Sequence, residues 1–274
     1  MKNSRREFIK GLSYGAALVF GGTYQKLSAN EIFNQRSNVK LRFLVASDSH
    51  YGQANTAYDA MLDEFLKEAN LFHESNPLDF CVINGDIIHD EPKFMPEAKI
   101  KYDQLKVPYY VTKGNHDKIS DGAWQTIWKM PVNHQVVMEK NSIILVTTSN
   151  EKGDYLSPDL GYLKTQLDAS TKLKNVFLFV HIPQTKRTNN GIETPAFFEL
   201  LENYSNVRAV FHGHEHDQDG ISFKSDIPFI FDAHIGGSWG TKYKGFRVVE
   251  LMKDKSLVTY MMNPREEILR ETIL

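Results

Sequence analysis

One sequence feature constrains the fold of this chain most. Several short apolar runs each end in residues whose side chains carry oxygen or nitrogen donor atoms. Five such runs occur along its 274 residues. The motifs that follow them are, in order, Asp48-Ser49-His50, Gly85-Asp86, Gly114-Asn115-His116-Asp117, His181-Ile182-Pro183 and Gly213-His214-Glu215-His216. Because open α/β sheets bind ligands where their strands end, the pattern predicts an α/β domain with one polar site at a sheet edge.

The spacing of apolar residues predicts alternating helices and strands, followed by a strand-rich end. Strands are expected at residues 39–46, 79–84, 107–112, 136–138, 143–148, 176–180, 207–211, 221–223, 228–231, 245–252 and 257–262. Helices are expected at residues 55–75, 96–105, 159–170 and 194–204. Since no repeat or Pro/Gly-rich linker interrupts residues 30–274, we expect them to form one compact domain with mixed sheets.

Composition narrows the class of partner. The chain is 41% hydrophobic and 24% charged, which is ordinary for a soluble globular protein. Its formal net charge is -2, but residues 1–29 carry +4 and the remainder therefore −6. An acidic body does not favour non-specific binding to a phosphate backbone, so we expect no nucleic-acid partner. The single cysteine, Cys81, excludes an intrachain disulfide and a cysteine-based zinc site.

The first 29 residues resemble a twin-arginine export signal. Arg5 and Arg6 are followed by Phe8, Lys10 and a weakly apolar, Gly-rich segment. Lys10 and Lys26 enclose 15 residues, whereas a membrane-spanning helix needs about 20. We therefore expect a signal peptide over residues 1–29, recognised by the twin-arginine machinery of a bacterium and directing the chain to the periplasm. Its cleavage motif is weak, so retention as an anchor stays open.

The motifs combine donors that suit metal ions. Two side chains two residues apart point the same way in an extended chain, so Asp48 and His50 can reach one cation. Asp86 can bridge two cations. Asn115 offers a neutral oxygen, and we expect its neighbour His116 to face a substrate instead, with Asp117 orienting it.

The second half of the chain supplies further imidazoles, because His181 precedes a strand-ending proline and His214 and His216 lie two residues apart. Taken singly, such residues are more often hydrogen-bonded histidines or turns. Taken together at five strand ends, they favour a metal centre.

In this order the motifs resemble those of the calcineurin-like metallophosphoesterase superfamily, over residues 48–216. The resemblance implies a four-layer α-β-β-α sandwich of two mixed sheets flanked by helices, so residues 30–274 would form a metallophosphoesterase domain. It implies one metal ion bound by Asp48, His50, Asp86 and His216. It implies a second bound by Asp86, Asn115, His181 and His214. His116 would contact the phosphoester and serve its leaving group.

Two metal ions suit the hydrolysis of a phosphoester. Cations roughly 3.5–4 Å apart neutralise its charge and lower the pKa of a bridging water, whose hydroxide then attacks phosphorus. His116 would protonate the departing oxygen. Oxygen and imidazole ligands suit iron, manganese, zinc or cobalt, and the identity of the pair stays open. The expected substrate is a small phosphomonoester or phosphodiester, and a nuclease or a non-catalytic metal- or phosphate-binding protein is the alternative.

Several branches of the superfamily have features that this sequence lacks. The run His89-Asp90-Glu91 replaces the Asp-Arg-Gly of protein phosphatases, and His89 replaces the metal-binding tyrosine of purple acid phosphatases. Only 58 residues follow His216, too few for the substrate domain of periplasmic nucleotidases. Small single-domain members remain as the expected type.

Loops near the motifs are expected to set specificity. Basic residues at Lys186 and Arg187 would bind a phosphate, and Trp239 would stack on a base. For each of these residues an ordinary surface position is the favoured interpretation. His73, His134 and His212 are assigned no function, and His89 is either a neighbour that supports the site or simply exposed.

Overall fold

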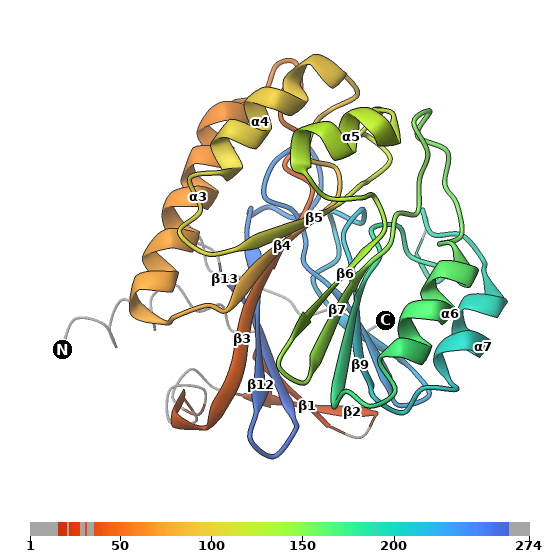
Figure 1. Cartoon of the computed structure of the whole chain (residues 1–274). Helices are drawn as coiled ribbons and strands as arrows, with labels where there is room; N and C mark the ends of the chain where they lie inside the picture. Colours follow the sequence, from red (N-terminus) through yellow and green to blue (C-terminus); the bar gives the residue numbers. More distant parts are fainter. Residues whose placement is uncertain (1–15, 21, 28–30, 32–35, 189, 263–274) are drawn as a thin grey trace.

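Two β-sheets pack face to face, and helices cover the outer side of each (Figure 1). The computed structural model describes residues 16–20, 22–27, 31, 36–188 and 190–262. This arrangement confirms the expected α/β fold with two mixed sheets flanked by helices. Among the described residues, no helix combines the length and apolarity needed to cross a membrane.

The first sheet has seven strands in the order β2-β1-β13-β12-β3-β4-β5. Its strands are β1 (Ala16–Phe20), β2 (Thr23–Leu27), β3 (Val39–Ala46), β4 (Phe80–Asn84), β5 (Tyr109–Thr112), β12 (Phe246–Met252) and β13 (Leu257–Met262). β3, β4 and β5 run parallel to one another. The other neighbouring pairs of this sheet, which are β2–β1, β1–β13, β13–β12 and β12–β3, are antiparallel. The parallel strands therefore bring the segments that follow them to one edge.

The second sheet has six strands in the order β10-β11-β9-β8-β7-β6. Its strands are β6 (His134–Met138), β7 (Asn141–Leu145), β8 (Asn175–Phe179), β9 (Val207–His212), β10 (Ile221–Lys224) and β11 (Ile227–Phe231). β7, β8, β9 and β11 are parallel, and the two edge strands pair antiparallel. The β6–β7 hairpin matches the strand pair expected around residues 139–141.

Aromatic side chains fill the space between the sheets. Phe43 on β3 stacks on Phe80 of the same sheet, with ring centroids 4.7 Å apart. It also meets Phe177 and Phe211 of the second sheet edge-on, at 5.1 and 5.6 Å. Aromatic pairs in these geometries contribute about 0.5–1.5 kcal/mol each beyond their buried area. They fix the two sheets against each other.

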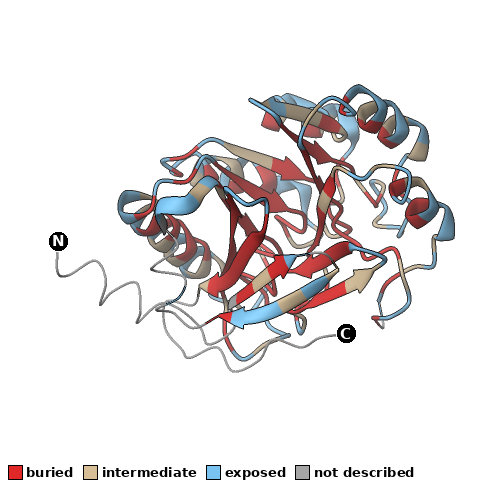
Figure 2. Cartoon of the chain, turned by 90° about the horizontal axis from the view of Figure 1, so that it is seen from below, coloured by how far each residue is buried: buried red, intermediate tan, exposed pale blue. Residues whose placement is uncertain are grey.

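Five α-helices of the described chain cover the sheets. α3 (Tyr58–Ser75), α4 (Met95–Tyr102) and α5 (Asp121–Trp128) pack on the first sheet, and α6 (Leu160–Ala169) and α7 (Pro195–Leu201) on the second. Short 3₁₀ turns occur at Arg36–Asn38 and Pro92–Phe94. α3 buries one face through residues at helical spacing, as expected from the sequence. Figure 2 shows buried residues along the strands and the inward faces of the helices.

Two features were not predicted from the sequence. α5 is a short helix capped by Ser120, whose hydroxyl accepts from the amide of Ala123, and it buries Trp124 and Trp128. The four-residue spacing of these tryptophans is a helical signal. β1 and β2 fall within the stretch expected to be an export signal. Ala17 and Val19 of β1 lie in the core between the sheets, whereas residues 1–15 lie outside the described residues.

A buried arginine joins the two sheets. Arg247 on β12 is fully buried. Its guanidinium donates to the carbonyls of Phe231 on β11 and Asp219, and to the hydroxyl of Thr259 on β13. A guanidinium can be buried only when its donors are satisfied, so Arg247 favours the observed placement of β11 of the second sheet against β12 of the first.

Replacing this arginine tests its role. We expect Arg247→Met to lower the free energy of unfolding by about 3–5 kcal/mol, because the carbonyls of Phe231 and Asp219 lose a buried charged donor. Urea denaturation followed by circular dichroism measures the change. The matched variant Arg187→Met removes an exposed guanidinium, and we expect it to stay within about 0.5 kcal/mol of the parent. Equal stability of both variants would contradict a bridging role for Arg247.

Candidate metal centre

The five motifs meet at one edge of the molecule. Each follows a parallel strand: Asp48 and His50 come after β3, Asp86 after β4, Asn115 after β5, His181 after β8, and His214 and His216 after β9. Their donor atoms form two groups, Asp48 with His50 and His216, and Asp86 with His181 and His214. Within each group the atoms lie within 4.8 Å of one another. The sequence prediction that these residues converge therefore agrees with the structure.

The first group is fully buried around the carboxylate of Asp48. Its Oδ1 lies 3.2 Å from His216 Nε2 and 3.8 Å from His50 Nε2, and these two nitrogens are 3.0 Å apart. Its Oδ2 accepts from the Ser47 hydroxyl and from the backbone amide of His214. One oxygen is thus anchored, and the other faces the imidazoles.

The second group contains buried polar atoms without a partner. Asn115 Oδ1 and His214 Nε2 have no hydrogen bond within the described part of the chain, and His181 Nε2 has only the carboxylates of Asp86 at 3.2 Å and Asp48 at 3.9 Å as near partners there. Leaving such atoms unpaired costs about 1–3 kcal/mol each, so native sites satisfy them. A carboxylate, two imidazole nitrogens and an amide oxygen are donors that a transition-metal ion takes. The residues present therefore fit a metal ion.

Asp86 connects the two groups. Its Oδ2 lies 3.2 Å from His181 Nε2 and 3.8 Å from His50 Nε2, which belong to different groups. Its Oδ1 accepts from the backbone amide of His116 at 2.8 Å. The carboxylate is held on one side by the backbone and faces both groups with the other.

Left-handed backbone places these side chains. The φ angles of Asp48, His50, Asp86 and His214 are +59°, +44°, +50° and +69°. Such conformations are costly for residues other than glycine and concentrate at functional sites. Asp48 and His50 do converge, but the expectation that an extended chain brings them together was wrong. They converge because the chain turns at both residues.

Gly85 makes room for His181. It adopts a φ of +90°, and a Cβ on it would lie 2.4 Å from His181 Nδ1. That nitrogen donates to the carbonyl of Asn84 at 2.6 Å. His216 Nδ1 likewise donates to the carbonyl of Trp239 at 3.2 Å. In the neutral form of each ring, with Nδ1 protonated, the lone pair is on Nε2, which faces the carboxylates.

The buried charges shift the ionisation of the site. Burial alone would raise the pKa of Asp48 and Asp86, yet the neighbouring histidines hold both well below the ordinary value. Burial alone would lower the pKa of His181, but Asp86 and Asp48 raise it to about 10. Burial lowers the pKa of His50 to about 3 and that of His214 to about 4. A cation must displace a proton from His181, so its affinity increases with pH.

His116 lies beside the two groups and is held by Asp90. Its Nδ1 lies 2.9 Å from Asp90 Oδ1, which also pairs with Lys118 Nζ at 2.9 Å. The expectation that Asp117 orients His116 was wrong. Asp117 is buried and accepts from the backbone amides of Ile88 and Gly114. It supports the loops, while the side chain that contacts His116 comes from the turn after β4.

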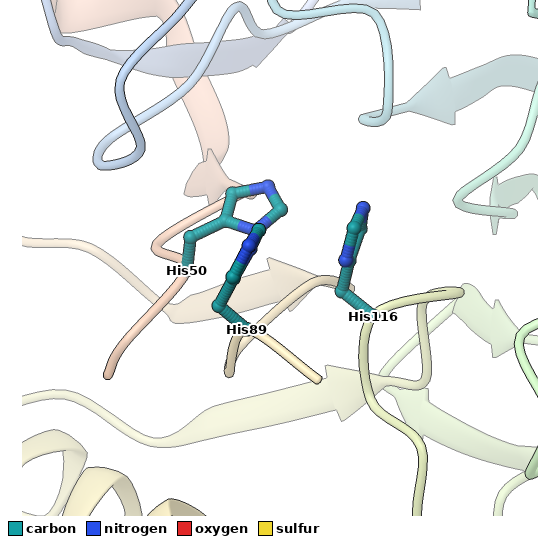
Figure 3. A group of neighbouring side chains, drawn as sticks. All are labelled: His50, His89 and His116. Atoms are coloured by element: carbon teal, nitrogen blue, oxygen red, sulfur yellow. The ribbon is translucent and has the colours of Figure 1, made fainter. Parts of the chain in front are cut away.

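Three further residues lie at the site: Asp90 and Asp232, which were assigned no role from the sequence, and His89, for which support of the site or simple exposure was left open. Asp90 holds His116, and His89 Nδ1 lies 2.9 Å from His50 Nδ1 (Figure 3). Asp232 is buried with its Oδ1 2.8 Å from the Ser47 hydroxyl oxygen, and burial raises its pKa to about 8. Asp90 and His89 follow Asp86 directly, so proximity in sequence was the available signal. Asp232 lies far along the chain, and no local pattern marks it.

Exposed aromatic rings border both groups. The indole of Trp239 stacks on His216, with centroids 4.3 Å apart and planes 6° from parallel. The ring of Tyr155 meets His214 edge-on at 4.8 Å. Both side chains are more than two-fifths exposed. Arg187 instead donates to the carbonyl of Phe223 on β10, and His234 is buried with its Nδ1 against the carbonyl of Gly236.

Histidines assigned no function lie in structural positions. His212 is buried and donates to the carbonyl of Val180 at 3.0 Å. His73 accepts from the amide of Leu78, and His134 bonds to the carbonyl of Pro131. These contacts satisfy local backbone groups.

Solved structures share this fold at low sequence identity. A dimetal phosphatase from Danio rerio superposes with a TM-score of 0.68 at 15% identity, covering 84% of this chain and 98% of its own. Calcineurin-like phosphoesterase YfkN from Bacillus subtilis gives 0.52 at 14% identity, covering 86% and 94%. The NAD nucleotidase of Haemophilus influenzae gives 0.53 at 11% identity, covering 81% of this chain and 49% of its own. These likenesses support the fold.

A search of curated proteins finds no match to the sequence. The family model described as calcineurin-like phosphoesterase, in contrast, matches residues 41–218. That range begins in β3 and ends just after His216, so it contains both candidate metal-binding groups. The chain therefore belongs to the calcineurin-like phosphoesterases, and it is a metal-dependent hydrolase of phosphoester bonds.

Proposed function

We propose that the chain hydrolyses small phosphoesters with two metal ions that share Asp86. Asp48, His50 and His216 complete the first position, and Asn115, His181 and His214 the second. The observation that carries this assignment is the placement of Asp86 Oδ2 between His50 Nε2 and His181 Nε2, at 3.8 and 3.2 Å. Bound there, two divalent or trivalent ions supply positive charge that neutralises the phosphoryl oxygens and acidifies the attacking water.

His116 is assigned to the leaving group. Its Nδ1 donates to the carboxylate of Asp90, which leaves Nε2 as the nitrogen that can pass on a proton. Burial alone would raise the pKa of Asp90, but the hydrogen bond from Lys118 helps to hold it below its ordinary value, so the carboxylate stays an acceptor for His116. The side chain of His116 is about one-quarter exposed, so a substrate bound at the two metal positions can reach it. This arrangement supports the assignment of His116 as a general acid.

A small substrate with an organic group fits the surroundings. Trp239 and Tyr155 present partly exposed rings beside the two metal positions. The net charge of −6 outside residues 1–29 does not favour a nucleic acid. Oxygen and imidazole donors suit iron, manganese, zinc or cobalt.

The proposed activity is tested on the manganese-loaded chain with bis(p-nitrophenyl) phosphate and p-nitrophenyl phosphate. Release of nitrophenol from the diester would identify a phosphodiesterase. Hydrolysis of the monoester alone would identify a phosphomonoesterase. Absence of both, with two metal ions bound per chain, would contradict the hydrolase and favour a metal-dependent phosphate-binding protein.

Loss of the shared carboxylate is the sharpest test of the metal assignment. We expect Asp86→Asn to bind fewer than two metal ions and to lose activity, because the neutral amide no longer balances two cations. Elemental analysis by mass spectrometry after gel filtration gives the metal count. Asp168→Asn, at an exposed carboxylate on α6, is the matched control and should bind two ions. Full metal content in Asp86→Asn would refute the shared position.

The general-acid assignment makes a different prediction. We expect His116→Ala to retain two metal ions while kcat falls about 10²–10⁴-fold, the usual contribution of a general acid. A substrate whose leaving group needs no proton should restore most of the rate. Loss of metal in His116→Ala would instead make this residue a ligand.

We also propose that residues 1–29 act as a twin-arginine signal and that the enzyme works in the periplasm. The paired arginines support this proposal. Because β1 pairs with β13, removal of residues 1–29 would leave that strand as an edge. Retention of the segment as an anchor would keep the pair.

Export is tested by fractionating a bacterium that has an active twin-arginine system. We expect the parent chain in the periplasmic or membrane fraction and the variant Arg5→Lys, Arg6→Lys in the cytoplasm, because the paired arginines are the recognised feature. Amino-terminal sequencing of the exported protein shows whether β1 and β2 stay attached. Cytoplasmic location of the parent chain would refute the export proposal.

A further inference from the structure

His89 packs against both His50 of the first metal-binding group and His116, and the three ring centroids lie 4.8–5.0 Å apart (Figure 3). It follows Asp86 by three residues on the turn after β4 and is half-buried. Its Nδ1 lies 2.9 Å from His50 Nδ1. Its ring also stacks on that of His116, with centroids 4.8 Å apart and planes 12° from parallel.

The geometry of His50 decides which atom donates in this contact. His50 Nε2 faces the first group, 3.0 Å from His216 Nε2 and 3.8 Å from the carboxylates of Asp48 and Asp86. A nitrogen that serves a metal ion must offer its lone pair, so the neutral ring holds its proton on Nδ1. His50 Nδ1 therefore donates, and His89 Nδ1 accepts.

The acceptor of the Nδ1 proton is of a different kind at His50 than at two other imidazoles of the site. His181 and His216 donate their Nδ1 protons to backbone carbonyls of Asn84 and Trp239. A backbone acceptor is supplied by the fold whatever the side chain. The acceptor for His50 belongs to a side chain, so its orientation depends on the residue at position 89.

The backbone holds His89 where this contact requires it. The amide of His89 donates to the carbonyl of Tyr51, the residue after His50, at 3.0 Å. The amide of the next residue, Asp90, donates to the carbonyl of His116 at 3.0 Å. One turn is thus tied to both loops, and its two consecutive side chains contact His50 and His116.

We propose that His89 is a positioning residue that fixes the tautomer and orientation of His50 and supports the ring of His116. It keeps the lone pair of His50 Nε2 directed at the first metal position. Its stacked ring limits rotation of His116 away from that position. The inference rests on the proposed metal centre but assigns a role to a residue outside its ligand set.

Two substitutions separate the contacts of His89. His89→Phe keeps a flat ring for stacking on His116 and removes the Nδ1 acceptor. His89→Asn keeps an acceptor atom close to the position of Nδ1 and removes the ring. His73→Phe is the matched control. His73 lies on α3, away from the site, and its Nδ1 accepts from the amide of Leu78, so the substitution removes an Nδ1 acceptor elsewhere in the chain.

The readout is binding of Mn²⁺ to the metal-free full-length chain, with free Mn²⁺ measured by electron paramagnetic resonance. Removing the partner of a ligating histidine typically lowers metal affinity about 10–100-fold. We expect His89→Phe to weaken one of the two Mn²⁺ sites by this factor. His89→Asn and His73→Phe should stay within about threefold of the parent, since both keep an acceptor for His50. Long-range ¹H–¹⁵N spectra of the zinc-loaded parent should show His50 protonated on Nδ1.

The outcomes distinguish this proposal from the metal centre itself. Equal Mn²⁺ affinity of the parent and His89→Phe would refute the positioning role and leave the proposed function intact. An equal loss in His89→Asn and His89→Phe would also refute it, because the acceptor would then be irrelevant. A third Mn²⁺ in the parent that is lost in both variants would make His89 a ligand instead. Failure of the parent to bind Mn²⁺ would refute the metal centre and this role together.

Discussion

The buried carboxylate of Asp86 is the group on which the site depends. It is removed from water, and His181, His50 and the backbone amide of His116 stabilise its charge. A buried carboxylate is tolerated only with such partners. Because its partners come from β3, β5 and β8 of both sheets, the site exists only when the sheets are docked. The aromatic contacts of Phe43 and the hydrogen bonds of Arg247 hold the two sheets together. Both the hydrophobic core and the candidate site therefore require the sheets to be docked.

At this edge the strands determine where the loops start, and the loops determine the direction of the donor atoms. The parallel strands bring five loops together, and their amide pairing leaves little freedom in where each loop starts. The donor atoms are then aimed by positive φ angles at Asp48, His50, Asp86 and His214. Strain of this kind persists only where the surroundings over-determine the backbone. The imidazole of His181, which occupies the space that a side chain at position 85 would need, and the hydrogen bonds of Asp117 to the Ile88 and Gly114 amides provide that determination.

The sequence predicted the members of the site better than the links between them. Apolar runs mark strands, and the ends of neighbouring parallel strands converge, so patterning alone could place Asp48 with Asp86 in one sheet and His181 with His214 in the other. The partner of His116 could not, because Asp90 adopts a φ of +66° and turns its carboxylate toward a loop 26 residues away. Asp232 escaped notice for a related reason, since its contact with Ser47 spans 185 residues. β1 and β2 were missed because their apolar, Gly-flanked sequence also fits an export signal.

The histidines show how much of the site the fold determines by itself. Wherever the acceptor for an Nδ1 proton is a backbone carbonyl, as for His181 and His216, the tautomer follows from the strand and loop geometry. At His50 the acceptor is the imidazole of His89, and at His116 it is the carboxylate of Asp90. These two side chains are consecutive on one turn whose amides bind the 50–51 and 116 loops. Substitution at positions 89 and 90 can therefore change the chemistry of the site without changing its ligands or its fold.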